Sequence, residues 1–167
     1  MRAFLFYMTE QRLNTIKEKL ANFNLVYTDV NGSLSITIPN ENLLEVCNIL
    51  KNDADIKMEQ CRDAVGVDRF TKKNRFEIIY NLYSLTYKDR MFVRVEIDGK
   101  NPESQSLVSV WASTNWYERE AYDMVGIKFT GHPDLRRVYM PEEYEYHPLR
   151  KDFPQMGIEG SIPLPNK

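Results

Sequence analysis

Three carboxylates lie close together in one short segment, and they are the first candidates for chemistry in this chain. Glu118, Glu120 and Asp123 fall within two turns of a segment that can form a helix. Two carboxylates in a cleft can act as general acid and general base. Their spacing spreads them around the helix, however, and Arg119 lies between them. The pattern therefore favours salt bridges, within the chain or to a partner, over catalysis.

The two histidines, His132 and His147, could bind a metal ion, and each of them precedes a proline. A metal site would need a third ligand nearby, such as Asp134, Glu143 or Glu145. The spacing fits no known metal motif, and a residue before proline is extended or in a turn. We therefore expect the imidazoles to hydrogen-bond to backbone or to a partner carboxylate.

Composition narrows the class of protein further. The 167 residues are 43% hydrophobic and 28% charged, and the net charge is −2. This argues against nucleic-acid binding, which needs a strongly basic face. Cys47 and Cys61 match no CxxC pattern and cannot ligate an iron–sulfur cluster alone. We expect both to be buried, reduced thiols.

The sequence also lacks the common binding motifs. There is no GxGxxG, P-loop, GxSxG or HExxH. No stretch approaches the ~20 apolar residues that a membrane span needs. We expect a chain that reaches a membrane through partners and holds no nucleotide, flavin or cluster itself. The aromatic run Phe76, Tyr80, Tyr83 and Tyr87 could indicate an RNA-stacking sheet, but cross-strand packing is favoured.

The elements that would position these residues can be read from periodicity and turn signals. Asn31-Gly32 between β-prone runs is a hairpin signal. Asn115, with Glu118 three residues on, resembles a capping box, and Gly126 stands where a helix C′ glycine belongs. Helices are expected over 10–23, after Asn40 and after Asn115. Strands are expected over 25–30, 33–38, 76–86, 90–97 and 107–111, with an uncertain region over 56–75.

This order predicts an α+β fold with two layers, in which helices cover one side of a mainly antiparallel sheet. A C-terminal helix and an extended tail follow it. We expect a globular domain over residues 1–112 and a partner-binding part over residues 113–167. Glycine and proline punctuate residues 115–154, which interleave aromatic side chains with Arg136, Arg137, Arg150 and Lys151. Tyr and Arg are enriched at the centres of interfaces, so we expect this tail to take its order from neighbouring proteins.

Three motifs resemble one family. They are Tyr117–Ile127 (YEREAYDMVGI), Gly131–Arg137 (GHPDLRR) and His147–Pro154 (HPLRKDFP), and Phe76–Ser84 is similar to the same family's strand region. The family is that of the 30 kDa subunit, also called the C subunit, of NADH:quinone oxidoreductase (respiratory complex I). Two departures are Asn81, where the family usually has His, and Tyr146, where it usually has Gly.

The resemblance implies a cofactor-free scaffold subunit in the hydrophilic arm of this translocase, with no catalytic residues of its own. It would support electron transfer from NADH to quinone while FMN, the iron–sulfur clusters and quinone sit on partner subunits. It would pack against subunits D, B and I, on the cytoplasmic side of the bacterial inner membrane, and would not be a functional monomer. The equivalent subunit of a membrane-bound [NiFe] hydrogenase or F420H2 dehydrogenase is the alternative. A stand-alone enzyme and an RNA-binding module are rivals from other classes.

The residues expected at the partner interface come from the C-terminal helix and the tail. Salt bridges that hold the helix and its partner are expected from Glu118, Arg119, Glu120 and Asp123. Pairs with partner carboxylates are expected from Arg136, Arg137, Arg150 and Lys151. The apolar contact is expected to be anchored by Trp111, Trp116, Tyr122 and Phe153. The set consists of Trp116, Glu118, Arg119, Glu120, Tyr122, Asp123, His132, Asp134, Arg136, Arg137, His147, Arg150, Lys151, Asp152 and Phe153.

Overall fold

A five-stranded sheet forms the centre of the molecule. The computed structural model describes residues 8–71 and 73–160. The strands are antiparallel to their neighbours except for one parallel pair, β2 and β5. In spatial order they are β1 (Val26–Val30), β2 (Ser33–Thr37), β5 (Arg90–Ile97), β4 (Phe76–Tyr83) and β3 (Gln60–Asp68).

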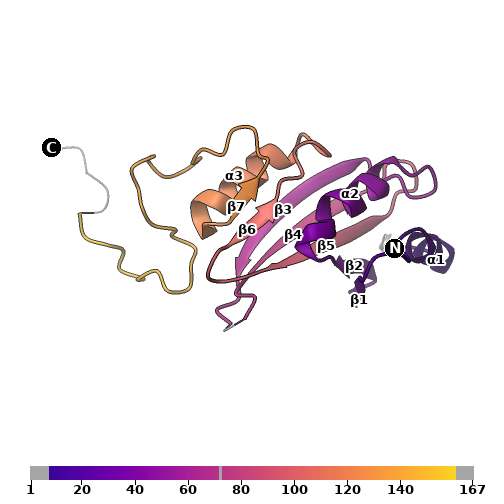
Figure 1. Cartoon of the computed structure of the whole chain (residues 1–167), viewed down its shortest axis with the longest axis horizontal. Coiled ribbons are helices and arrows are strands. Elements are labelled where there is room, and N and C mark those ends of the chain that lie inside the picture. The colour runs from indigo at the N-terminus through magenta and orange to yellow at the C-terminus, as the bar shows by residue number, and fades with distance from the viewer. Residues whose placement is uncertain (1–7, 72, 161–167) are drawn as a thin grey trace, which may run out of the picture.

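Helices and a small second sheet complete the fold (Figure 1). The helices are α1 (Glu10–Lys19), the 3-10 turn η1 (Asn40–Asn42), α2 (Leu43–Asn52) and α3 (Thr114–Val125). The second sheet pairs β6 (Glu103–Gln105) with β7 (Lys128–Thr130) in parallel. The N-terminal helix α1 lies at one end of the long axis, and the tail runs out at the other end.

The hairpin signals are confirmed. Asn31 and Gly32 have φ of 52° and 78°, as a type I′ turn requires, and they join β1 to β2 with Val30 opposite Ser33. The expected pairing of β4 with β5 is also present, with Phe76 opposite Ile97.

One face of this sheet carries the core. In β4 the buried hydrophobic residues are Phe76, Ile78, Tyr80 and Leu82, and the alternating residues of β5 are buried in the same way. The buried residues of α2, such as Cys47, and Ala121 of α3 belong to the same core cluster. The predicted α+β architecture, a mainly antiparallel sheet with helices, is therefore confirmed. The core runs from α1 to β7, so α3 and β7 are part of it.

Several expected boundaries are wrong for reasons of tertiary structure. Residues 107–111 form turns in which Leu107 O accepts hydrogen bonds from Val110 N and Trp111 N; the strand is β6, a few residues earlier. The uncertain region contains one long edge strand, β3, with a bulge between Cys61 and Asp63. Helix α1 ends at Lys19, before the expected end at residue 23.

Asn40 does not cap helix α2. Its Oδ1 accepts hydrogen bonds from Ser104 Oγ at 3.0 Å and from Gln105 N at 3.2 Å, which ties η1 to β6. The helix begins later, at Leu43. The side chain of Gln105 accepts a hydrogen bond from Leu44 N at 3.2 Å, so a residue distant in sequence satisfies this N-terminal amide. None of the helices within the described residues is long and apolar enough to span a bilayer.

Candidate functional site

Helix α3 is the element that organises the candidate site. Its buried face carries Ala121, Met124 and Val125. Gly126 ends it with φ of 83°, and Gly126 N donates to the carbonyls of Ala121 and Tyr122. This confirms the C′ glycine, since the left-handed conformation costs glycine little.

The predicted capping box at the start of α3 is wrong. The helix begins at Thr114, whose Oγ1 donates to Trp111 O at 2.9 Å. The N-cap Ser113 uses its hydroxyl to reach Cys61 O on β3 at 2.8 Å instead of capping the helix. Glu118 is turned inward, away from the helix terminus, where the sequence pattern had placed it.

Glu118 is fully buried and joins α3 to the sheet. Its carboxylate accepts hydrogen bonds from Ser106 Oγ at 2.6 Å, Leu107 N at 2.7 Å and Tyr80 OH at 3.4 Å. Burial disfavours the charged form and raises the pKa of Glu118 to about 7, although these hydrogen bonds oppose the shift. The group therefore fixes the helix on its scaffold and does not face a partner.

Asp123 is also fully buried, and it holds the tail. Its Oδ2 accepts hydrogen bonds from the backbone N–H groups of Val138, Tyr139 and Met140 at 3.0, 2.7 and 3.0 Å. Its Oδ1 pairs with Arg137 Nη1 at 2.6 Å. Burial alone would raise the pKa of Asp123, but these donors outweigh it and lower the pKa. A carboxylate with this many donors anchors the backbone of residues 138–140.

The HPLR segment of the tail caps the C-terminus of α3. His147 Nδ1 donates to Asp123 O at 2.9 Å, Leu149 N to Met124 O at 2.9 Å, and Arg150 Nε to Val125 O at 2.7 Å. The last carbonyls of a helix have no partner within the helix, and here the tail supplies the donors.

Gly126 makes room for this cap. A Cβ at Gly126 would lie 2.6 Å from the Cδ2 of His147 and would also collide with Arg150. The burial of the His147 ring lowers its pKa, and the nearby Arg150 and Arg137 act in the same direction. His147 is thus a neutral donor at neutral pH.

Two further contacts bind the first part of the tail to α3. Arg119 donates to the carbonyls of Arg136 and Arg137 at 3.1 and 3.3 Å and stacks over the ring of Trp116 at 4.5 Å. His132 Nε2 donates to Asn115 O at 3.2 Å, while its Nδ1 accepts from Asp134 N at 3.0 Å. Both histidines therefore hydrogen-bond to backbone, as expected.

The far end of the tail is held by residues that the sequence analysis missed. Asp68 at the end of β3 accepts hydrogen bonds from Arg75 Nε and Nη2 at 2.9 and 2.6 Å and from Lys151 N at 2.9 Å. Arg75 also pairs with Asp152 at 2.9 Å. Burial alone would raise the pKa of Asp68, but the donors lower it to about 2. Asp68 and Arg75 flank the β3–β4 turn. This position beside a turn is the one feature of the sequence that could have indicated their role.

The predicted interface residues thus divide into two groups. Arg137 and Arg150, expected to meet partner carboxylates, are bonded to α3, and Arg136 forms a surface pair with Asp134 at 2.7 Å. Trp111, an expected anchor, is buried, and its Nε1 donates to Met58 O.

The remaining predicted residues lie at or near the surface. Tyr122 packs edge-on against His147, and Phe153 against Tyr146, at 6.3 and 6.5 Å between ring centroids. The exposed members are Trp116, Glu120, Arg136, Lys151 and Asp152. Within the described residues no three His, Cys, Asp or Glu side chains are grouped as metal ligands.

The tail up to residue 152 therefore docks on its own domain. This differs from the expectation that neighbouring proteins supply its order. Buried donors and acceptors on α3 match the tail from His132 to Arg150, and Asp68 extends the match to Lys151.

Comparisons with known proteins identify the family to which this chain is similar. The family model for the respiratory-chain NADH dehydrogenase 30 Kd subunit matches residues 36–159. The C subunit of NADH-quinone oxidoreductase from Roseiflexus sp. (strain RS-1) is 38% identical over 147 residues, which are 88% of this chain and 84% of that protein. Its counterpart from Geobacter metallireducens is 36% identical over 150 residues, 89% of this chain and 91% of that protein.

Two solved structures share the fold. The trypsin-resistant fragment (1–134) of Nqo5 superposes with a TM-score of 0.63 at 31% identity, and the match covers 74% of this chain and 99% of the fragment. A chain of an archaeal respiratory membrane complex, the membrane-bound sulfane sulfur reductase, has a TM-score of 0.74 at 18% identity and 88% coverage of both chains, which shows the fold alone. The relatives at higher identity are subunits of NADH-quinone oxidoreductase, which favours that complex over the hydrogenase alternative. Residues 36–159, the greater part of this chain, thus establish that it belongs to the 30 kDa subunit family of the respiratory-chain NADH dehydrogenase.

Proposed function

We propose that this chain is a scaffold subunit in the hydrophilic arm of a proton-translocating NADH:quinone oxidoreductase. In this proposal it contacts subunits D, B and I on the cytoplasmic side of the bacterial inner membrane, and it is attached to the membrane through them. FMN, the iron–sulfur clusters and quinone are carried by other subunits. The partner-binding part lies within residues 113–167, of which α3 and β7 also belong to the common core.

The docking of the tail on α3 is the observation that carries this proposal. Asp123 fixes the backbone of residues 138–140. The side chains of these residues are therefore held in fixed positions on the surface. Trp116, Tyr139 and Leu149 are 59%, 60% and 60% exposed. Exposed Trp and Tyr on a rigid frame are typical energetic centres of interfaces. We therefore assign the partner contact to these side chains, while the buried cations position the tail.

The cysteines and His132 support a chain without a redox group of its own. Cys47 and Cys61 are buried, and two cysteines are fewer than the four ligands that an iron–sulfur cluster takes. Both ring nitrogens of His132 already hydrogen-bond within the chain.

The experiment is assembly in the native host. A tagged full-length chain that carries Trp116→Ala and Tyr139→Ala would be compared with wild type and with Val26→Ala. Val26 is as exposed as Tyr139 but lies on β1, at the far edge of the sheet. Loss of a hot-spot aromatic costs ~2 kcal/mol or more, so we expect the double variant to reduce the assembled fraction on native gels. Normal assembly of the double variant, or equal loss with Val26→Ala, would reject the assigned surface.

A further inference from the structure

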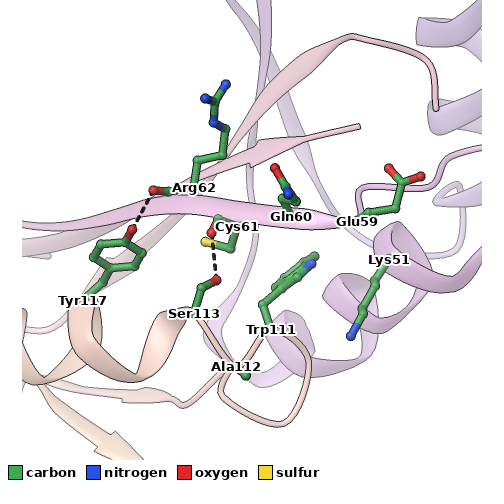
Figure 2. Close-up of a pocket in the computed structure, with 9 residues that line it drawn as sticks. All are labelled: Lys51, Glu59, Gln60, Cys61, Arg62, Trp111, Ala112, Ser113 and Tyr117. Carbon is green, nitrogen blue, oxygen red and sulfur yellow. Dashed lines mark hydrogen bonds between the residues drawn. The ribbon is translucent and has the colours of Figure 1, made fainter. Parts of the chain in front are cut away.

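Strand β3 is an edge of the five-stranded sheet, and the chain itself covers the first part of this edge. Figure 2 shows Ser113 Oγ donating to Cys61 O and Tyr117 OH donating to Arg62 O, both at 2.8 Å. Just before the strand, Trp111 Nε1 donates to Met58 O at 3.0 Å. Side chains that satisfy the edge carbonyls prevent a foreign strand from pairing there.

The second part of the edge borders a groove that is lined by apolar residues and by two acidic ones. The groove has a volume of about 230 Å³ and lies between β3, α3 and Leu149 of the tail. Its floor contains small residues, Ala64, Gly66 and Ala121. A Cβ on Gly66 would lie 3.0 Å from the Cβ of Ala121, so the close approach of helix and strand depends on this glycine. The groove is smaller than the ~300–1,000 Å³ of small-molecule sites, and it has room for a side chain.

Exposed apolar residues and unused carboxylates border the groove. Val65 of β3, which is 48% exposed, and the exposed Leu149 are among the lining residues. Asp63 and Glu120 also line it. Glu118 and Asp123, the other acids of α3, are consumed by internal hydrogen bonds. Among the described residues, neither Asp63 nor Glu120 has an ion pair or side-chain hydrogen bond. These two acids, which we call the rim of the groove, therefore have no basic partner there.

We propose that an extended segment of a neighbouring subunit of the complex binds along residues 63–67 of β3. One of its apolar side chains enters the groove, and an Arg or Lys beside it meets Asp63 and Glu120. The mode is strand addition to a free edge, in which backbone hydrogen bonds give affinity and the groove gives specificity. The inference rests on the proposed function, because it takes the occupant from the same complex.

The test places a photo-crosslinking amino acid at Val65 of the full-length chain and purifies the complex from native membranes after irradiation. The matched control carries the same amino acid at Val26, an exposed valine on β1, the opposite edge strand. We expect position 65 to cross-link to one segment of a neighbouring subunit that contains an apolar residue next to Arg or Lys. Position 26 should give no such product.

Charge variants test the rim. Asp63→Lys with Glu120→Lys should lower the yield of this cross-link about tenfold, since like charges at a contact repel. Glu45→Lys, an exposed acid on α2, should leave the yield unchanged. A product within this chain or with a second copy, a segment without a basic residue, or a yield insensitive to the rim charges would overturn the inference.

The assembled fraction, measured on the same samples, separates the two proposals. If the chain is absent from the complex, the proposed function fails. If the chain is present in the complex but position 65 cross-links to no other subunit, the groove proposal fails alone.

Discussion

Three acids that the sequence groups on one helix have three different environments. Glu118 is buried against the sheet, Asp123 is buried under the tail, and Glu120 is exposed. The sign of each pKa shift follows from the balance of burial and donors. The donors around Asp123 outweigh its burial and lower its pKa, whereas the donors around Glu118 do not offset its burial, so the pKa of Glu118 is raised. Replacement of Asp123 or Glu118 by its neutral amide is therefore expected to have different effects.

Asp123→Asn should release the tail. The amide keeps the size of the carboxylate but turns an N–H group toward donors and removes the ion pair with Arg137, which keeps its hydrogen bonds to Asp123 O and Tyr146 O. Breaking a buried pair costs ~3–5 kcal/mol. We expect faster hydrogen exchange of the amides of residues 138–140, with little change in the amides of the sheet core. Glu120→Gln on the same helix is the control and should leave exchange unchanged. Equal protection in wild type and Asp123→Asn would contradict the anchor.

Glu118 should make stability depend on pH. Its pKa is raised from 4.5 to about 7 in the folded chain. The stability that the protonated Glu118 side chain adds to the free energy of unfolding is therefore fully present below the unfolded pKa. It is lost as pH rises through about 7. The advantage of wild type over Glu118→Gln should shrink by about 3 kcal/mol between pH 4.5 and 8, since one pKa unit is about 1.4 kcal/mol.

Urea unfolding of both proteins at both pH values measures this difference. The depressed pKa values of Asp68 and Asp123 act in the opposite direction at lower pH, but they are common to both proteins and cancel in the comparison. A difference that stays constant across the range would argue that Glu118 keeps an ordinary pKa.

At the scale of elements, the end of α3 and the tail are one unit. Gly126 and Gly131 have nearly equal φ of 83° and 81°, but a Cβ at Gly126 would collide with His147 and Arg150, while one at Gly131 meets nothing within 4 Å. Gly131→Ala should cost ~1–2 kcal/mol for the left-handed conformation alone.

Gly126→Ala should cost more than Gly131→Ala and should also displace residues 147–150. Thermal unfolding measures the cost, and trypsin cleavage after Arg150 and Lys151 measures the displacement. Equal costs and equal cleavage in the two variants would mean that the cap is not a tight contact.

Elements with a local cause could be predicted from the sequence. Asn31-Gly32 needs positive φ, and Gly126 needs the left-handed conformation, so both were placed correctly. Strand β5 alternates strictly, β4 alternates from Ile78 onward, and both strands were also found. The helix starts expected at Asn40 and at Asn115 were wrong. The side chains of Asn40 and Glu118 bond instead to Ser104 and Ser106, which lie elsewhere in the chain. The sequence pattern at a helix start does not contain these partners.

The sequence identified the residues of the candidate site but not what each of them contacts. The local sequence does not show that Arg137 and Arg150 face inward. That depends on Asp123 and on the carbonyl groups exposed at the end of α3. The anchor at Asp68 and Arg75 lay outside the resemblance motifs of the tail and joins segments far apart in the chain.

At the scale of the whole molecule, one core holds the helices and both sheets, and the tail is fastened to its surface at α3 and at the β3–β4 turn. The internal polar groups of the tail are used in this fastening, so the outward aromatic and apolar side chains remain for other subunits. Such an arrangement suits a subunit that holds its neighbours at fixed positions.

The central claim is that this chain holds redox subunits in place and carries no electrons itself. Purification of the tagged chain from native membranes, with quantification of co-purifying subunits, tests it most directly when combined with metal, flavin and quinone analysis of the chain expressed alone. The account predicts subunits D, B and I in equal amounts and no redox group on the lone chain. Recovery of the chain without these subunits, or with a bound redox group, would contradict it.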